Sequence, residues 1–303
     1  MASRTIRLGT RGSKLALIQA TNAKRLLEAS NENLEVEIIT IKTSGDRGDR
    51  NVLGAFVRDI EQELLDGSID LALHCLKDLP TLTIDGLSFA AYLEREDPRD
   101  AILTLVEDWN NLPGGAVIGT GSVRRSAQLK ASRPDLQYKP LVGNADTRLR
   151  KLHEGEYDAI VLAMAGLNRM GVENLPLGTI VTHLPLDAML PAPGQAVLVL
   201  QCRAEDFFAS AVAGKLDHDP TRNSASAERA FMRCFGSGCS VPVAAYCLEI
   251  DGHYDLRGLV SSPDGTRSIR GHTGGHDPLL MGKQLGEQLL SQGAGELMAD
   301  VVR

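Results

Sequence analysis

Short apolar strand patterns alternate with amphipathic helix patterns from residue 5 to residue 170. Residues 5–9 have the composition of a strand, and Ser13 can cap a helix whose apolar side chains recur on one face. The same pair of patterns recurs, with strands predicted at 34–42, 69–76, 87–92, 116–120, 136–142 and 157–163 and helices at 56–65, 122–131, 145–153 and 165–170. Such alternation predicts α/β domains with largely parallel sheets, which bind ligands at the carboxyl ends of their strands.

Polar and proline-containing segments interrupt this alternation. Residues 94–100 are polar and contain Pro98, and a fresh run of strand and helix patterns follows them, so we predict a domain crossing there. The segment 190–195 is a second interruption, followed by an apolar strand at 196–202. After residues 217–220 the patterns change to a helix at 223–235, strands at 243–250, 254–260 and 268–271, and a helix at 278–292, which predicts a small α+β domain.

Composition narrows the function classes. The formal net charge of −7 disfavours non-specific nucleic-acid binding, which needs a positive surface to displace phosphate counterions. No apolar run approaches the roughly 18 residues that span a membrane, and the first residues lack a signal-peptide core. We therefore expect a cytoplasmic protein with no membrane or nucleic-acid partner.

The pattern of the five cysteines and of two nearby histidines does not predict a metal site. An odd number of cysteines without a Cys-x-x-Cys pair argues against a disulfide framework and a structural zinc site. His272 and His276 have helical ligand spacing, but Gly274 and Gly275 disfavour a helix, so we predict a solvated loop there.

Arginines gather near predicted strand-to-helix turns, at Arg11, Arg124, Arg125, Arg148, Arg150 and Arg169. Scattered solvated arginines are the simpler interpretation, which suits Arg150 but not the adjacent pair that opens a helix. The turn Gly119-x-Gly121 lacks the third glycine of a dinucleotide loop, because Arg124 occupies that position. A helix start with hydroxyls and guanidiniums favours carboxylate or phosphate ligands instead.

Two further positions could carry chemistry. Lys77 and Asp78 follow an apolar strand; they are either an exposed ion pair or charges at the floor of a cleft, where a carboxylate can stabilise a developing cation. Cys239 lies in a Gly-Ser-Gly-Cys-Ser-Val-Pro stretch after a predicted helix. Most isolated cysteines are buried structural residues, but a thiol on such a loop can also carry a covalent group.

Five motifs follow one another along the chain: HCLKDLP at 74–80, EREDPRD at 94–100, GTGSVRR at 119–125, Gly143-Asn144 with TRL at 147–149, and GSGCSVP at 236–242. In this order they resemble the porphobilinogen deaminase (hydroxymethylbilane synthase) family. The resemblance implies two hinged periplasmic-binding-protein-like α/β domains with mainly parallel sheets, at 1–93 with 196–213 and at 99–190. It also implies a small C-terminal α+β domain at 218–303 and a monomer.

The resemblance further implies an activity and a set of site residues. Family members condense four porphobilinogen molecules head to tail, with loss of ammonia, on a dipyrromethane cofactor held through a thioether. Cys239 matches the attachment cysteine, and Asp78 matches the catalytic aspartate that stabilises the cation formed when ammonia leaves. Positions matching substrate- or cofactor-binding residues are Arg11, Ser13, Gln19, Phe56, Lys77, Thr120, Ser122, Arg124, Arg125, Gly143, Arg148 and Arg169. No metal is implied.

The chain departs from the family pattern at several positions. Val142 stands where an arginine is usual, the segment 46–56 is short and lacks lysine, Gly121 replaces a serine, and Ala196 and Val199 replace glycines. Two alternatives therefore stay open beside the transferase: a slow or inactive paralogue, and a non-catalytic two-lobed anion-binding protein.

Overall fold

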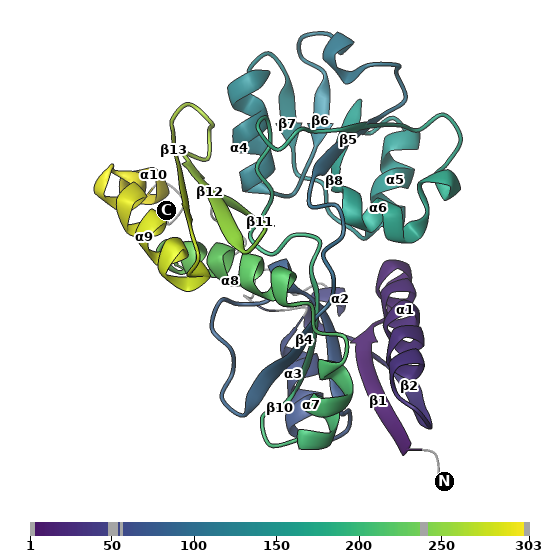
Figure 1. The fold of residues 1–303 in the computed structure, drawn as a ribbon. Coiled ribbons are helices and arrows are strands. Elements are labelled where there is room, and N and C mark those ends of the chain that lie inside the picture. Colours follow the sequence, from purple (N-terminus) through teal and green to yellow (C-terminus); the bar gives the residue numbers. More distant parts are fainter. Residues whose placement is uncertain (1–3, 48–53, 55–56, 237–241, 300–303) are drawn as a thin grey trace. The chain divides into compact units, whose positions relative to one another are not determined.

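The structure is a computed structural model that describes all residues except 1–3, 48–53, 55–56, 237–241 and 300–303. The chain divides into two compact units. Unit 1 contains Met1–Glu96 and Ala196–Asn223, and unit 2 contains Asp97–Gln195 and Ser224–Arg303. Figure 1 shows β10 and α7, which come late in the chain, grouped with the N-terminal elements of unit 1.

Unit 1 is built on a five-stranded mixed sheet of order β2-β1-β3-β10-β4. Its strands are β1 (Arg4–Arg11), β2 (Leu34–Ile41), β3 (Leu71–Cys75), β4 (Leu87–Tyr92) and β10 (Leu198–Arg203). β1 is parallel to β2 and β3, whereas β10 is antiparallel to both β3 and β4. The helices are α1 (Lys14–Ser30), α2 (Ser44–Arg47), α3 (Arg58–Leu65), the 3₁₀ turn η1 (Leu76–Asp78) and α7 (Phe207–Gly214). Leu8, Leu27, Leu71 and Leu200 are buried in the main core of this unit.

The first sheet of unit 2 has the corresponding order β7-β6-β8-β5-β9. Its strands are β5 (Asp100–Thr104), β6 (Val117–Gly119), β7 (Gln137–Lys139), β8 (Ala159–Ala163) and β9 (Ile180–His183). β6 is parallel to β7 and β8, and β5 is antiparallel to β8 and β9. The helices are α4 (Val123–Ser132), α5 (Ala145–His153), α6 (Met164–Met170) and the 3₁₀ turns η2 (Trp109–Asn111) and η3 (Val172–Asn174).

The second sheet of unit 2 is antiparallel, with the order β11-β12-β13. It comprises β11 (Val243–Ile250), β12 (His253–Ser261) and β13 (Ser268–Gly275). The helices α9 (Pro278–Ser291) and α10 (Ala294–Ala299) accompany it, together with α8 (Asp219–Arg233), whose first residues belong to unit 1. A β-carbon at Gly271 would lie 2.9 Å from side-chain atoms of both Leu285 and Leu289, so the strand needs glycine where α9 packs on it. His272 lies on this strand, so the loop predicted there from Gly274 and Gly275 is wrong: Gly274 lies against His253 of β12 and Gly275 against Met281 of α9.

The predicted fold class, mixed α/β with mainly parallel sheets and a small C-terminal α+β part, is confirmed by these topologies. The direction of β5 and β10 is the main addition to the prediction, since both run against their neighbours. The three domain boundaries and the hinge stay predictions. Among the described residues, none of the helices has the length and apolar character needed to cross a membrane.

Candidate active site

In unit 1 the predicted residues follow the carboxyl ends of two adjacent parallel strands. β1 ends at Arg11, after which Ser13 caps α1 by accepting a 3.3 Å hydrogen bond from the Ala16 amide. β3 leads directly into η1, which contains Lys77 and Asp78. Asp78 is exposed and Lys77 is half-buried. Because β1 and β3 pair in parallel, these cationic, hydroxyl and carboxylate groups belong to one edge of the sheet.

Backbone bonds and a buried amide hold the end of β3 in place. The Leu76 amide donates to the Val197 carbonyl at 3.0 Å, and the Leu79 amide closes the turn onto the Leu76 carbonyl at 3.2 Å. Gln19, on α1, is buried, and its Oε1 lies 3.8 Å from the Cys75 Sγ. Gln19 therefore packs beside the last residue of β3 and supports the turn that carries Asp78.

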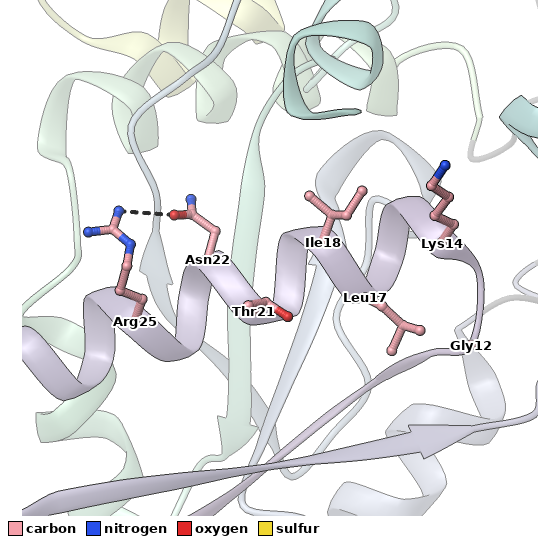
Figure 2. Close-up of a pocket in the computed structure, with 7 residues that line it drawn as sticks. All are labelled: Gly12, Lys14, Leu17, Ile18, Thr21, Asn22 and Arg25. Carbon is pink, nitrogen blue, oxygen red and sulfur yellow. Dashed lines mark hydrogen bonds between the residues drawn. The ribbon is translucent and has the colours of Figure 1, made fainter. Parts of the chain in front are cut away.

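A hollow of about 670 Å³ lies along α1 (Figure 2). Its lining includes Lys14, Ile18, Asn22 and Arg25, and the Arg25 guanidinium donates to the Asn22 side chain at 3.1 Å. None of the predicted site residues lines this hollow, so we assign no chemistry to it.

In unit 2 the turn between β6 and α4 is ordered by its hydroxyl groups. The Thr120 Oγ1 accepts from the Ser122 amide at 3.2 Å, and the Ser122 Oγ caps α4 by accepting from the Arg125 amide at 3.4 Å. A β-carbon at Gly121 would lie 2.9 Å from the Leu141 carbonyl oxygen. The glycine in place of the usual serine is therefore required by the close approach of the next turn.

The turn before α5 carries the second group of predicted residues. Gly143 has a φ of +121°, a conformation that favours glycine, and Asn144 caps α5 by accepting from the Thr147 amide at 2.9 Å. The Arg148 Nε donates back to the Gly143 carbonyl at 2.9 Å. The neighbouring Val142 side chain is 53% exposed, so this position offers room for a longer side chain.

Arg124 and Arg125 form a buried ion cluster with Asp100. The Arg124 NH1 lies 2.8 Å from Asp100 Oδ2, and the Arg125 NH2 lies 2.7 Å from Asp100 Oδ1. The two arginine side chains are 5% and 8% exposed and the carboxylate is fully buried, so neither guanidinium is a solvated surface group. Burial lowers the pKa of Arg124, an effect that the carboxylate of Asp100 opposes and the charge of Arg125 reinforces.

Asp100 belongs to this buried cluster, and the sequence interpretation did not identify it as a candidate. It begins β5, which is antiparallel, and it pairs with Ala163, the last residue of the parallel strand β8. A strand that starts where its neighbour ends brings its first side chain to the edge at which an α/β sheet binds ligands. The detectable signal was an acidic residue at the start of an apolar strand in a segment otherwise interpreted as a linker.

The remaining predicted residues have different placements. Arg169 is half-buried on α6, whereas Arg150 is exposed and pairs with Glu154 one turn along α5. Phe56 and Cys239 lie outside the described residues. α8 and β11 flank the segment that contains Cys239, and the buried Glu228 of α8 accepts hydrogen bonds from the amides of Gly194 at 2.7 Å and Cys247 at 2.8 Å.

Two family models match the chain. Residues 6–210 match "Porphobilinogen deaminase, dipyromethane cofactor binding domain", and residues 223–291 match "Porphobilinogen deaminase, C-terminal domain". The chain belongs to the porphobilinogen deaminase family. A porphobilinogen deaminase of Brevibacillus brevis is 43% identical over 305 residues, covering 98% of this chain and 97% of that protein. A porphobilinogen deaminase of Geobacter sulfurreducens is 42% identical over 310 residues, covering 99% and 96%.

Solved structures of other proteins are more distant. The VFT2 domain of Bordetella pertussis BvgS aligns with a TM-score of 0.43 at 16% identity, covering 74% of this chain and 91% of that one. An amino acid ABC transporter substrate-binding protein from Streptococcus pneumoniae aligns with a TM-score of 0.41 at 15% identity, covering 70% and 86%.

The donor set of unit 2 fits the dipyrromethane cofactor of the matched family. Each pyrrole ring of that cofactor carries two carboxylates, which prefer guanidinium forks and the free amides of helix starts. The turn at Ser122, Arg124, Arg148 of α5 and Arg169 of α6 carry groups of this kind. Among the described residues, no group of three or more metal-ligating side chains is placed to hold a metal ion.

Proposed function

We propose that this chain condenses four porphobilinogen molecules into hydroxymethylbilane on a dipyrromethane bound through Cys239. The observation that carries the proposal is the match of both family models to residues 6–210 and 223–291, with Asp78 and Cys239 at their motif positions. The bound dipyrromethane supplies the pyrrole carbon from which the chain grows. We further propose that the protein acts in the cytoplasm as a monomer.

We assign Asp78 to the reacting centre. When the aminomethyl C–N bond of porphobilinogen breaks, ammonia leaves and the substrate becomes a cation delocalised over its pyrrole ring. A carboxylate beside that ring accepts the pyrrole N–H and stabilises the positive charge. The Asp78 side chain is exposed on a turn whose backbone is held to Val197, so it can meet a substrate without losing its position. The bound dipyrromethane or growing chain would supply a free ring carbon that bonds to the methylene carbon of this cation and then loses its proton, while Asp78 would hold the pyrrole N–H.

The cationic residues bind carboxylates in this proposal. Arg11, Ser13 and Lys77 follow strand ends of unit 1, and we assign them to the acetate and propionate groups of the substrate. Thr120, Ser122, Arg124, Arg148 and Arg169 belong to unit 2, and we assign them to the cofactor and growing chain. Arg125 supports this group through Asp100. Each added ring brings two more carboxylates, which explains why so many cationic side chains are needed.

Ammonia release tests the proposal against its alternatives. Given porphobilinogen, the wild-type protein should release four equivalents of ammonia per hydroxymethylbilane formed, and Cys239→Ser should release none above background. Saturable porphobilinogen binding without ammonia release would replace the transferase with a two-lobed anion-binding protein. Ammonia release that stops after a few equivalents per protein would indicate a slow paralogue.

A further inference from the structure

One carboxylate in unit 2 organises two guanidiniums at the ligand edge of the sheet. We propose that Asp100 is a positioning residue: it holds Arg124 so that the Nε–NH2 edge of that guanidinium can grip a carboxylate of the cofactor or growing chain. This inference rests on the proposed function, because it names the residue that aims an arginine of that site.

The two arginines use their donors differently. A guanidinium has five N–H donors, and its Nε and one terminal nitrogen form a side-on fork suited to a carboxylate. Arg125 uses this fork to bind Asp100: its Nε and NH2 donate to Oδ1 at 3.0 Å and 2.7 Å. Its NH1 donates to the Val161 carbonyl at 3.0 Å. All three nitrogens of Arg125 are therefore engaged with groups of the protein.

Arg124 is bound through a single nitrogen. Its NH1 donates to the Leu190 carbonyl at 2.6 Å and lies 2.8 Å from Asp100 Oδ2. Its Nε and NH2 have no hydrogen-bond partner among the described residues. The side-on fork of Arg124 is therefore the one that remains for a ligand carboxylate.

Both groups that the Arg124 NH1 contacts, the Leu190 carbonyl and the Asp100 carboxylate, are themselves fixed. Asp100 Oδ1 also accepts from the Gln195 Nε2 at 2.9 Å, and that amide donates to the Pro98 carbonyl at 2.7 Å. Leu190 is clamped by Gln128, whose Nε2 donates to the Leu190 carbonyl at 3.0 Å and whose Oε1 accepts from the Leu190 amide at 2.9 Å. A hydrogen bond and an ion pair from one nitrogen to two fixed groups orient the guanidinium and hence its unused edge.

The charge balance supports the same role. Two guanidiniums meet one carboxylate in a buried setting, so one positive charge of the cluster is uncompensated within these three side chains. An uncompensated buried charge is unfavourable unless a further counterion completes the cluster. A bound carboxylate on the free edge of Arg124 is that counterion. The negative charge of Asp100 neutralises one guanidinium, and the carboxylate of the ligand neutralises the other.

Loading of apo-protein tests the proposal. Apo-protein made in a host without porphobilinogen is incubated with porphobilinogen, and intact mass measures the fraction that gains the cofactor adduct. Asp100→Asn should raise the porphobilinogen concentration needed for half-loading by roughly tenfold, the effect of one charge-assisted contact. Ile102→Ala is the matched control, because Ile102 is a fully buried apolar residue two positions along the same strand. That variant should lose stability but load like wild type.

A second variant keeps the test informative if Asp100→Asn does not fold. Gln128→Leu retains every charge of the cluster and removes the clamp on Leu190, together with a 3.4 Å hydrogen bond from Gln128 Nε2 to the Arg124 backbone carbonyl, so it should shift half-loading in the same direction by a smaller factor. If Asp100→Asn or, failing it, Gln128→Leu loads as readily as Ile102→Ala, Asp100 is not a positioning residue. A wild-type protein that never gains the adduct would overturn the proposed function itself.

Discussion

The five-stranded sheets of the two units share one plan but differ at one matched position. In each sheet the fourth strand of the order is antiparallel to its neighbours. In unit 1 this strand begins at Leu198, which pairs with Cys75, the last residue of β3. In unit 2 it begins at Asp100, which pairs with Ala163, the last residue of β8. The same point at the ligand edge is apolar in one sheet and charged in the other.

This difference separates two ways of building a functional edge. Leu198 is buried in the main core of unit 1, so apolar packing holds the strand ends while Asp78 stays exposed on the turn beyond them. Asp100 instead pairs with two buried arginines, so two guanidinium groups are held in defined positions within unit 2. We infer that unit 1 supplies the group that acts on the reacting atoms and unit 2 supplies preorganised charge.

The largest expected effect is on the chemistry assigned to unit 1. Asp78→Asn keeps the size of the side chain but removes the charge that stabilises the substrate cation, so turnover should fall by roughly 10²–10⁴-fold. The unfolding midpoint should hardly change, because the side chain is exposed. Steady-state rates and thermal unfolding measure the two quantities. Near-normal turnover would remove Asp78 from the reacting centre.

Exchanging the residue types at the matched position is the next largest test. Asp100→Leu leaves two buried guanidiniums without their carboxylate and should cost about 3–5 kcal/mol in the free energy of unfolding. Leu198→Asn leaves a buried amide in an apolar core and should cost about 1–3 kcal/mol. Urea unfolding of both variants measures the difference. Equal tolerance of the two exchanges would mean that the charged cluster is not special to unit 2.

Val142 tests whether unit 2 has room for more fixed charge. Val142→Arg adds a guanidinium at an exposed position beside Gly143, and a charge-assisted contact there should raise turnover by up to roughly tenfold. Val142→Lys is the control, because it adds charge without a bidentate fork and should give a smaller gain. An unchanged rate in both variants would show that other residues already compensate for the valine.

The smallest expected effect is a pH dependence of the free energy of unfolding that comes from His74 in unit 1. Burial lowers the pKa of His74 from 6.5 to about 4, so the folded state takes up this proton later than the unfolded state as the pH falls. Stability is therefore lost on acidification below about pH 6.5, amounting to about 1 kcal/mol between pH 7.5 and 5.5. Burial raises the pKa of Glu61, which acts in the opposite direction, so the variant His74→Asn is needed to isolate the histidine.

Urea unfolding at the two pH values measures this prediction. The stability of His74→Asn should fall less on acidification than that of wild type. His272→Asn, at an exposed position on β13, should respond to pH as wild type does. An identical pH response in wild type and His74→Asn would contradict a buried neutral His74.

Local signals in the sequence were sufficient for much of this architecture. Ser13 caps a helix as predicted, and Ser122 caps the helix that was predicted to begin there, because a hydroxyl at a helix start acts through bonds within one turn. The direction of β5 and β10 could not be predicted, since an apolar run has the same composition whichever way it enters a sheet. Asp100 looked like part of a polar linker because its partners, Arg124 and Arg125, are distant in the sequence. Likewise, Gly274 and Gly275 suggested a loop, and their packing against His253 of β12 and Met281 of α9 involves residues that the local pattern does not show.

The mass of the intact protein tests the central proposal most directly. Protein expressed in a host that makes porphobilinogen should exceed its sequence mass by one dipyrromethane, and Cys247→Ser should carry the same adduct. Cys239→Ser should have the unmodified mass, because its hydroxyl cannot form the thioether. Wild-type protein at its unmodified mass after expression with porphobilinogen, or an adduct that survives in Cys239→Ser, would contradict the proposed cofactor attachment.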